Sequence, residues 1–149
     1  MSAPFASDAW IDQWADALRS SDAVRDAATT WVYGPVAFDI DGDAEHGVEP
    51  TTLELDVTAG GVRGVRRIDR SDLRLTPFVV GGPFTRWKGV FSGSLPVVDG
   101  VRDARLRSSG DLPTIWRHAG LFDAIAAAGS SVATSWQDDA VEAGAGATA

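Results

Sequence analysis

The first hydrophobic pattern along the chain has the period of a helix. Trp10, Trp14 and Leu18 recur every four residues, with acidic and polar residues between them. This spacing predicts an amphipathic helix that buries both indole rings in the core. Ser7 is suited to accept the hydrogen bonds of an N-cap, and Asp8 favours the first helical turn.

A second, shorter helix is expected after Ser21. From residue 31 onward the hydrophobic period shifts toward two, which predicts a strand within residues 31–41. Pro35 lies inside this stretch and has no backbone N–H to donate. It therefore indicates either an edge position for the strand or an interruption of it.

Residues 51–68 alternate twice around a glycine-rich centre, which predicts a β-hairpin. The alternation is imperfect around Gly64, so a bulge is expected there. Residues 72–80 are interpreted as a fourth strand with Leu73 and Leu75 on one face.

The stretch "GGPFTRWKGVFSGSL" follows this strand. The glycine pair 81–82 is expected to end the strand, and Phe84, Trp87 and Phe91 recur at helical spacing. Gly93 is suited to the position just after a helix, where a left-handed backbone is common. The pattern predicts a short helix with one apolar stripe.

The remaining segments predict one more strand and a final helical region. Residues 94–100 are interpreted as an apolar turn, and the alternation over residues 102–110 predicts a strand. Asp111 is suited to cap a helical region over residues 111–129, which Gly120 is expected to split.

The order of these elements is α-α-β-β-β-β-α-β-α. Short connections between the middle strands favour a mostly antiparallel sheet covered on one face by helices, an α+β fold. We expect residues 1–136 to form a single domain. Residues 137–149 are small and polar, so a disordered tail is predicted there.

The composition narrows the function classes. With a net charge of −8, the surface repels phosphate backbones, so nucleic-acid binding is not expected. The local group of Arg63, Arg66, Arg67 and Arg70 lies beside an acidic strand, which predicts mutual neutralisation. An acidic surface with one lysine suits a high-salt habitat, and high-GC codon usage would explain the same bias toward arginine.

Further features of the sequence exclude whole classes of site. Cysteine is absent, which excludes disulfides and thiolate sites. No long apolar run and no signal peptide are found, so we expect a cytoplasmic protein. The order Lys88-Gly89 does not match a phosphate-binding loop. No catalytic motif and no cofactor are predicted.

His46 and His118 are the only imidazoles. His46 lies in an acidic loop, where a role as a metal ligand competes with the simpler interpretation of a solvated residue. His118 follows Trp116 and Arg117 near Gly120 and fits a charge partner at a helix C-terminus. The spacing of the acidic residues is not that of a calcium loop. The acidic side chains in the metal alternative are Asp41, Asp43 and Glu45.

The run from Asp72 to Ile115 resembles the sterol carrier protein-2 (SCP-2) lipid-binding family. Phe84, Trp87 and Gly93 match the family's aromatic helix that ends in glycine. Residues 110–112 match the turn that opens its last helices. The resemblance extends over roughly residues 10–128.

This resemblance implies a five-stranded, mostly antiparallel sheet covered by helices, with an apolar tunnel between the layers. It implies binding of fatty acids, acyl-CoAs, isoprenoids, phospholipids or sterols, without catalysis and with at most transient membrane contact. The residues expected to face the tunnel are Phe84, Trp87, Val90, Phe91, Val97, Val98, Leu106, Ile115, Trp116, Phe122 and Ile125.

Three functional hypotheses remain open from the sequence. The first is a cytoplasmic protein that binds or transfers an apolar ligand. The second is an interaction module in which the same aromatic residues form a packed core or a dimer face. The third is a small α+β enzyme acting on apolar substrates, for which Asp111 and His118 are the only candidate acid–base groups.

Overall fold

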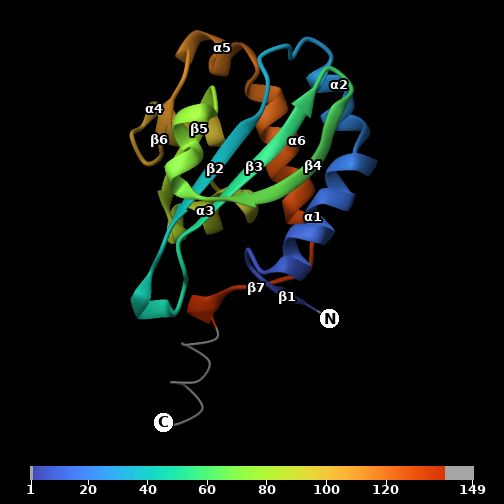
Figure 1. Cartoon of the computed structure of the whole chain (residues 1–149). Coiled ribbons are helices and arrows are strands. Elements are labelled where there is room, and N and C mark those ends of the chain that lie inside the picture. The colour runs from blue at the N-terminus through green and yellow to red at the C-terminus, as the bar shows by residue number, and fades with distance from the viewer. Residues whose placement is uncertain (1, 140–149) are drawn as a thin grey trace, which may run out of the picture.

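The computed structural model describes residues 2–139 and shows one five-stranded sheet with helices packed on one face (Figure 1). β2 pairs in parallel with β5, and the other neighbours are antiparallel. The predicted α+β fold is therefore confirmed. In spatial order the strands are β4 (Gly61–Ile68), β3 (Thr51–Thr58), β2 (Val36–Asp41), β5 (Phe78–Pro83) and β6 (Arg107–Ser109).

The helices are short, and most pack against one face of the sheet. Two 3₁₀ helices lie in connections, and the chain ends meet in a two-stranded parallel pair. The helices are α1 (Asp8–Ser20), α2 (Asp22–Ala28), α3 (Phe84–Phe91), α4 (Val97–Arg102), α5 (Leu112–Arg117) and α6 (Ala119–Ser130). The other elements are η1 (Ala44–His46), η2 (Arg70–Leu75), β1 (Ala3–Pro4) and β7 (Thr134–Ser135).

The predictions for α1 and for the hairpin are confirmed. The Ser7 hydroxyl accepts from the Trp10 amide at 3.3 Å, and both indoles of α1 are fully buried. In the hairpin the register shifts between Leu55 and Val57. Two residues of β4, among them Gly64, then oppose one residue of β3, so the expected bulge is present.

β2 is the central strand, so the edge position that Pro35 suggested is wrong. Pro35 instead lies directly before the first residue of the strand, so the predicted stretch from residue 31 forms a strand only from Val36. Because Pro35 lies outside the strand, its missing N–H removes no hydrogen bond of the sheet. The proline is therefore tolerated next to a central strand.

The fourth strand is shorter than predicted, because residues 70–75 form η2 instead. Alternating leucines suggested a strand, but Leu75 is exposed and only Leu73 is partly covered. Pro77 cannot donate to a ladder, so pairing begins only at Phe78. The polar residues before it close 3₁₀ turns, such as the bond from the Asp72 amide to the Asp69 carbonyl.

Gly81 and Gly82 lie inside β5, so the prediction that they end the strand is wrong. A Cβ on Gly81 would lie 2.8 Å from the guanidinium of Arg107. On Gly82 it would lie 2.8 Å from the Leu106 side chain. Both glycines therefore allow side chains of the β6 segment to lie against the strand.

Three further boundaries differ from prediction. The apolar turn at 94–100 contains α4, and β6 covers only three residues of the predicted strand. The last helical region divides at His118 rather than at Gly120. Of the predicted tail, residues 137–139 are described and residues 140–149 lie outside the described part. Among residues 2–139 no helix is long and apolar enough to cross a membrane.

Candidate functional site

Large aromatic side chains fill the space between the sheet and the helices. Phe38 projects from β2 and lies 4.7 Å from Trp87 of α3, centroid to centroid. Trp14 of α1 meets Phe91 edge-on at 5.2 Å. The Trp87 Nε1 donates to the Asp39 carbonyl at 3.2 Å, so its one polar atom is satisfied inside the core.

The structure brings the eleven residues predicted from the sequence into this one apolar layer. Ten are buried, and Trp116 is partly buried against the core, where Arg102 lies 5.7 Å from its ring. Their burial agrees with the predicted apolar faces of the helices. The tunnel that the resemblance implies is not shown by residues 2–139, where these side chains contact one another.

We call one end of this layer the terminal cluster: Phe5, Trp10, Trp14, Phe84, Phe91 and Trp136. Phe5 stacks on Trp136 at 4.7 Å and meets Trp10 edge-on at 4.9 Å. The paired strands β1 and β7 hold these two ends of the chain together, and Gln137 Nε2 donates to the Phe5 carbonyl. The segments around β1 and β7 therefore cover this end of the core.

Lys88 adds ion pairs at the same end. Its Nζ lies 3.0 Å from an oxygen of Asp138 and 2.8 Å from one of Asp139. The hydrogen bond to Asp139 raises the pKa of Lys88 above its usual value. The only lysine of the chain thus connects α3 to the C-terminal segment, a role that no sequence pattern indicated.

We call the opposite end the loop cluster: Trp31, Tyr33, Phe78, His118 and Phe122. The Trp31 ring lies 5.1 Å from the rings of Tyr33, Phe78 and His118. Its Nε1 donates to the Gly34 carbonyl at 2.7 Å, which fixes the loop before β2. Connecting loops, not paired strands, cover this end.

An apolar groove of about 180 Å³ opens beside the core between the end of α3 and α6. Val90 and Leu95 form its buried wall, and small residues of α6 form the other side. Burial and the nearby Asp99 raise the pKa of Asp123 at its rim. The complete lining is Val90, Gly93, Leu95, Pro96, Asp123, Ala126, Ala127 and Ser130.

Several solved structures have the same arrangement of elements. A conserved hypothetical protein from Thermus thermophilus, described as a candidate sterol carrier protein, matches with a TM-score of 0.76 and 22% identity over 91% of this chain and 94% of its own. A structure of sterol carrier protein 2 matches with a TM-score of 0.75 and 23% identity over 85% of this chain and 98% of its own. The chain has an SCP-2-like fold.

A third SCP-2-like structure, sterol carrier protein 2 from Yarrowia lipolytica in its apo form, has a TM-score of 0.56 and 14% identity. It covers 88% of this chain and 97% of its own. No protein-family model matches the sequence, and no curated protein does. The likeness therefore lies in the arrangement of the elements, which the predicted resemblance identified.

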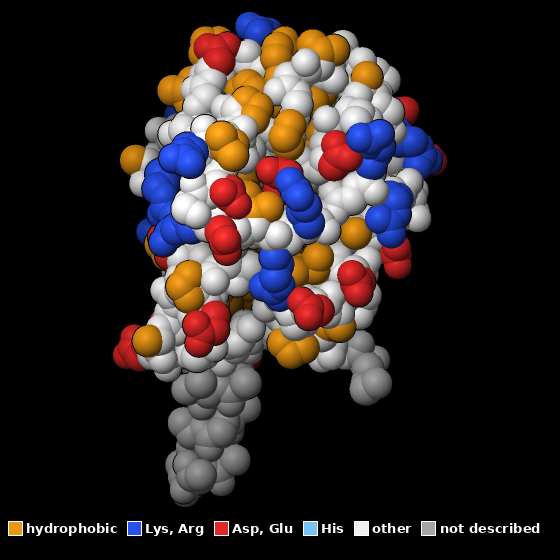
Figure 2. Space-filling view, in the orientation of Figure 1, with side chains coloured by type: hydrophobic (Ala, Val, Ile, Leu, Met, Phe, Trp, Pro, Cys, Tyr) orange, Lys and Arg blue, Asp and Glu red, His pale blue; other side chains and the backbone are white. Residues whose placement is uncertain are grey.

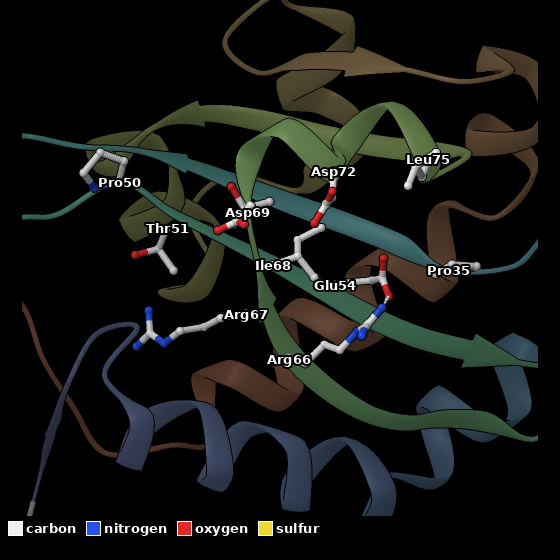
Figure 3. Close-up of a pocket in the computed structure, with 11 residues that line it drawn as sticks. Pro35, Pro50, Thr51, Glu54, Arg66, Arg67, Ile68, Asp69, Asp72 and Leu75 are labelled. Atoms are coloured by element: carbon white, nitrogen blue, oxygen red, sulfur yellow. Dashed lines mark hydrogen bonds and ion pairs between the residues drawn. The ribbon is translucent and has the colours of Figure 1, made fainter.

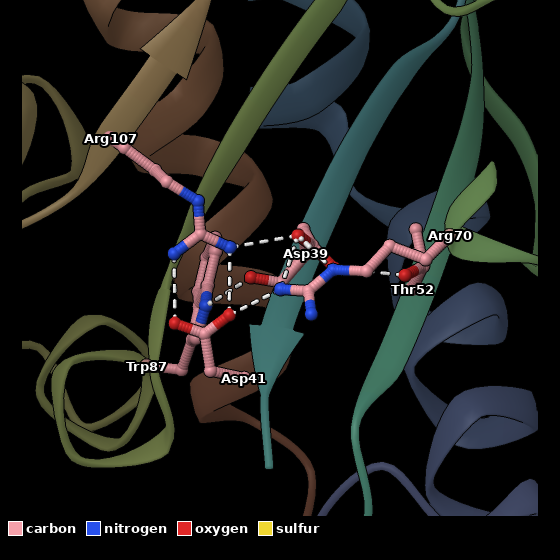
Figure 4. A network of polar contacts seen from close by, with 6 residues as sticks. All are labelled: Asp39, Asp41, Thr52, Arg70, Trp87 and Arg107. Atoms are coloured by element: carbon pink, nitrogen blue, oxygen red, sulfur yellow. Dashed lines mark hydrogen bonds and ion pairs between the residues drawn. The ribbon is translucent and has the colours of Figure 1, made fainter. Parts of the chain in front are cut away.

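On the open face of this SCP-2-like sheet, two aspartates and two arginines form a neutral network (Figure 4). The carboxylate of Asp39 is almost fully buried and accepts from Thr52, Arg70 and Arg107 at 2.8–3.0 Å. Hydrogen bonds from Arg107 lower the pKa of the neighbouring Asp41. All four charges are paired, so the network is a structural feature of the sheet.

A hollow of about 790 Å³ lies on the same open face, between β4 and η2 (Figure 3). Polar and charged side chains form much of its wall, and Arg66 in it already pairs with Glu54 at 2.8 Å. Ligand sites for apolar molecules are concave and mostly apolar, so size alone does not make this hollow the site. We therefore place the candidate site at the apolar layer and its groove.

His46 belongs to a group in which ligand atoms of Asp43, Glu45 and His46 lie within 4.8 Å of one another. His46 Nδ1 lies 2.7 Å from Asp43, and this hydrogen bond raises the pKa of His46 and lowers that of Asp43. Asp41 is not in this group, because it binds the two arginines. His46 and Asp43 form an ion pair near the surface, and the exposed Glu45 lies beside it.

The two groups proposed for an enzyme already have structural partners. Asp111 is exposed and accepts from the Thr114 hydroxyl at 2.5 Å. His118 is buried, its Nδ1 donates to the Thr114 carbonyl, and its Nε2 lies 3.2 Å from the Thr30 hydroxyl. Both ring nitrogens are thus occupied at the end of α5, and nothing in this geometry favours the enzyme hypothesis.

Several important residues were missed from the sequence. Phe38 lies buried between the sheet and the helices, Trp31 is buried in the loop cluster, and Phe5 and Trp136 close the opposite end of the core. The sequence "VAFDI" did indicate the network of aspartates and arginines on the open face of the sheet. An aspartate inside an apolar run must find hydrogen-bonding partners when it is buried. For Phe5 and Trp136, isolated in sequence, no periodicity was available.

Proposed function

We propose that this protein binds an apolar molecule with a long hydrocarbon part, such as a fatty acid or an isoprenoid, between its helices and its sheet. The observation that carries the proposal is the apolar groove at Val90, which opens directly onto the buried layer of an SCP-2-like fold. The structural neighbours carry the name sterol carrier protein, and the proposed role requires no bond-making step.

The size of the groove determines how binding would occur. At about 180 Å³ it is smaller than the roughly 300–1,000 Å³ of typical ligand pockets. A long chain must therefore displace Val90 and Leu95 or move α6 away from α3. Each methylene that leaves water contributes about 0.8 kcal/mol, so a chain of ten or more carbons can offset this rearrangement.

A second function is favoured by a different observation. The aromatic rings of the core are already within packing distance of one another, as Phe38 and Trp87 show. A domain with such a core would serve as a stable interaction module and would bind no lipid. The two functions differ in whether the groove accepts a ligand, which can be measured directly.

The experiment is a titration with a fluorescent fatty acid, followed by quenching of the tryptophan emission. Ala127 lines the groove from the exposed side of α6, so Ala127→Trp should fill it without altering the core. Ala23 is exposed on α2, and Ala23→Trp is the matched control. We expect saturable binding that Ala127→Trp weakens at least tenfold and Ala23→Trp leaves unchanged.

Two results would contradict the proposal. One is the absence of saturable binding for fatty acid and isoprenoid probes alike. The other is equal binding by both tryptophan variants, which would place the ligand elsewhere. Native mass spectrometry of the purified protein provides an independent test, because a co-purified lipid appears as a mass shift.

A further inference from the structure

The large hydrophobic side chains that remain exposed in residues 2–139 are not scattered over the surface. Val32 is 77% exposed, Leu75 is 74%, Leu112 is 41% and Tyr33 is 37%. They come from three connections: the loop before β2, the segment before β5 and the start of α5. We call these four residues the loop tip.

The strand register places these three connections side by side. Val36 pairs with Phe78, so the segments that precede β2 and β5 leave the sheet at the same end. Val79 pairs with Ser109, which brings the start of α5 to this end as well. Figure 2 shows hydrophobic side chains gathered at the upper end of the molecule, the end that carries α5 in Figure 1.

The core beneath supports the loop tip. The Tyr33 ring lies 6.0 Å from the ring of Phe78 and 5.6 Å from that of His118. Pro35 and Leu75 line the same hollow, so the first two connections also meet on the open face of the sheet. The exposed side chains are thus held in place by the loop cluster and lie directly over it.

The charge around the loop tip differs from that of the whole chain. Residues 30–35, 72–77 and 110–118 contain Arg74, Arg117, Asp72 and Asp111 and are neutral together, whereas the chain carries a net charge of −8. Within the described part of the chain, neither Arg74 nor Arg117 forms an ion pair, although most other arginines do. Two cations without acidic partners therefore flank the exposed hydrophobic side chains.

We propose that the loop tip is a docking surface for a phospholipid bilayer that contains anionic lipid. Aliphatic side chains beside a tyrosine suit the boundary between headgroups and acyl chains, and the nearby arginines suit anionic headgroups. Val32 and Leu75 project from separate loops as single side chains. A fluid bilayer accommodates such projections without a matching surface, whereas a protein partner needs shape complementarity.

The orientation that follows is specific. A molecule docked through the loop tip faces the bilayer with the loop cluster and holds the terminal cluster away from it. Use of this surface for lipid uptake rests on the proposed function. Docking itself does not depend on that function, because it requires only the four side chains and the flanking arginines.

The test is sedimentation of the full chain with vesicles of phosphatidylcholine, with and without phosphatidylserine. Val32→Asp combined with Leu75→Asp should reduce binding at least tenfold, because it places two charges in the bilayer boundary. The matched control is Ala23→Asp combined with Ala44→Asp, which changes the net charge equally at two exposed positions elsewhere. Its binding should stay within twofold of the unaltered protein.

A second pair of variants separates the electrostatic part. Arg74→Gln with Arg117→Gln should remove the preference for phosphatidylserine while leaving weak binding to phosphatidylcholine. Added salt should have the same effect, because it screens exposed charges over about 10 Å at 0.1 M. Circular dichroism on each variant confirms that the fold is retained.

The proposal is overturned if the unaltered protein binds neither kind of vesicle, or if the two double-aspartate variants bind equally. It is also overturned if ultracentrifugation shows a dimer that Val32→Asp with Leu75→Asp dissociates, since the loop tip would then be a contact between copies. Fatty-acid titration in solution is read separately. Retained vesicle docking without fatty-acid binding would overturn only the proposed function.

Discussion

The two ends of the apolar core are covered in different ways. At the terminal cluster β1 pairs with β7, Trp136 stacks on Phe5, and Lys88 binds Asp138 and Asp139. At the loop cluster only connections cover the aromatic rings, and they leave hydrophobic side chains in solvent. Paired backbone and ion pairs oppose opening at the first end, while the second presents its apolar residues outward.

The difference indicates a division of tasks. Segments that open easily have few buried contacts and few backbone hydrogen bonds to the rest of the fold. The loop before β2, which contains Trp31, fits this description better than the pair of β1 and β7 does. The backbone of this loop forms no strand pairing before Val36. We therefore expect stability to depend mainly on the terminal cluster and contact with partners to depend on the loop cluster.

The largest effect is expected for Trp14→Ala in the terminal cluster. Trp14 is fully buried, and its Nε1 donates to the Ile125 carbonyl at 3.2 Å. Truncation leaves a cavity and should lower the free energy of unfolding by about 3–5 kcal/mol. Tyr33→Ala in the loop cluster removes a partly exposed ring and should cost about 1 kcal/mol. Denaturant unfolding of both variants measures the difference, and equal losses would contradict the comparison.

A smaller effect is expected where α6 approaches α3. A Cβ on Gly129 would lie 2.4 Å from the Phe91 ring, so Gly129→Ala should force this ring of the terminal cluster to move. The expected loss is about 1–3 kcal/mol, as for other overpacked cores. Gly120→Ala in the same helix is the matched control, because no atom lies within 4 Å of the added Cβ.

Gly120→Ala should leave stability unchanged or raise it by up to about 1 kcal/mol through helix propensity. Thermal unfolding measured side by side gives the sign of each change. If both alanine variants shift the midpoint in the same direction, the close approach of α6 to Phe91 is not what stabilises this end.

Much of the fold was predictable because its periodic patterns are long. The indoles of α1, the alternation of the hairpin and the stripe of α3 each repeat often enough to determine an element. The pattern of α4 was too short, since its six residues contain a glycine. Leu73 and Leu75 led to a predicted strand that begins too early, because two alternating leucines do not outweigh the proline that follows them.

For the candidate site, the sequence predicted the apolar faces but not what closes them. All the predicted residues lie in or against the core, because apolar stripes on helices must be buried. Phe5 and Trp136 are brought together by a pairing of two-residue strands from opposite ends of the chain, which no local pattern encodes. The clustering of exposed hydrophobic side chains also depends on the tertiary fold, so Val32 and Leu75 could not be recognised as neighbours from their spacing in the sequence.

Removing the ion pairs of Lys88 should lower the free energy of unfolding only modestly. Its effect on local opening of the C-terminal segment should be clearer. Lys88→Met keeps most of the aliphatic stem but removes the charge that binds Asp138 and Asp139. We expect a loss of about 0.5–1 kcal/mol, typical of partly exposed pairs. Hydrogen exchange of the amides at residues 132–136 should become several-fold faster, with little change in the loop before β2. Unchanged exchange would show that the strand pairing alone holds the C-terminal segment.

The smallest effect concerns pH and the contact between His46 and Asp43, which lies near the terminal cluster because the His46 and Phe84 rings are 6.5 Å apart. The hydrogen bond to Asp43 raises the pKa of His46 above 6.5 in the folded state. Its contribution to stability is therefore complete below pH 6.5 and is lost as pH rises through the folded pKa. On the acid side, the lowered pKa of Asp43 means that its contribution is lost as pH falls through that value.

We expect His46→Gln to flatten the decline in the unfolding midpoint as pH rises above 6.5, where the contribution of a histidine with a raised pKa is lost. Asp43→Asn should flatten the same part of the profile, because it removes the partner that raises the pKa. The double variant should then add nothing to either single one. A decline that persists in His46→Gln would show that the contact between His46 and Asp43 does not cause the pH dependence of stability.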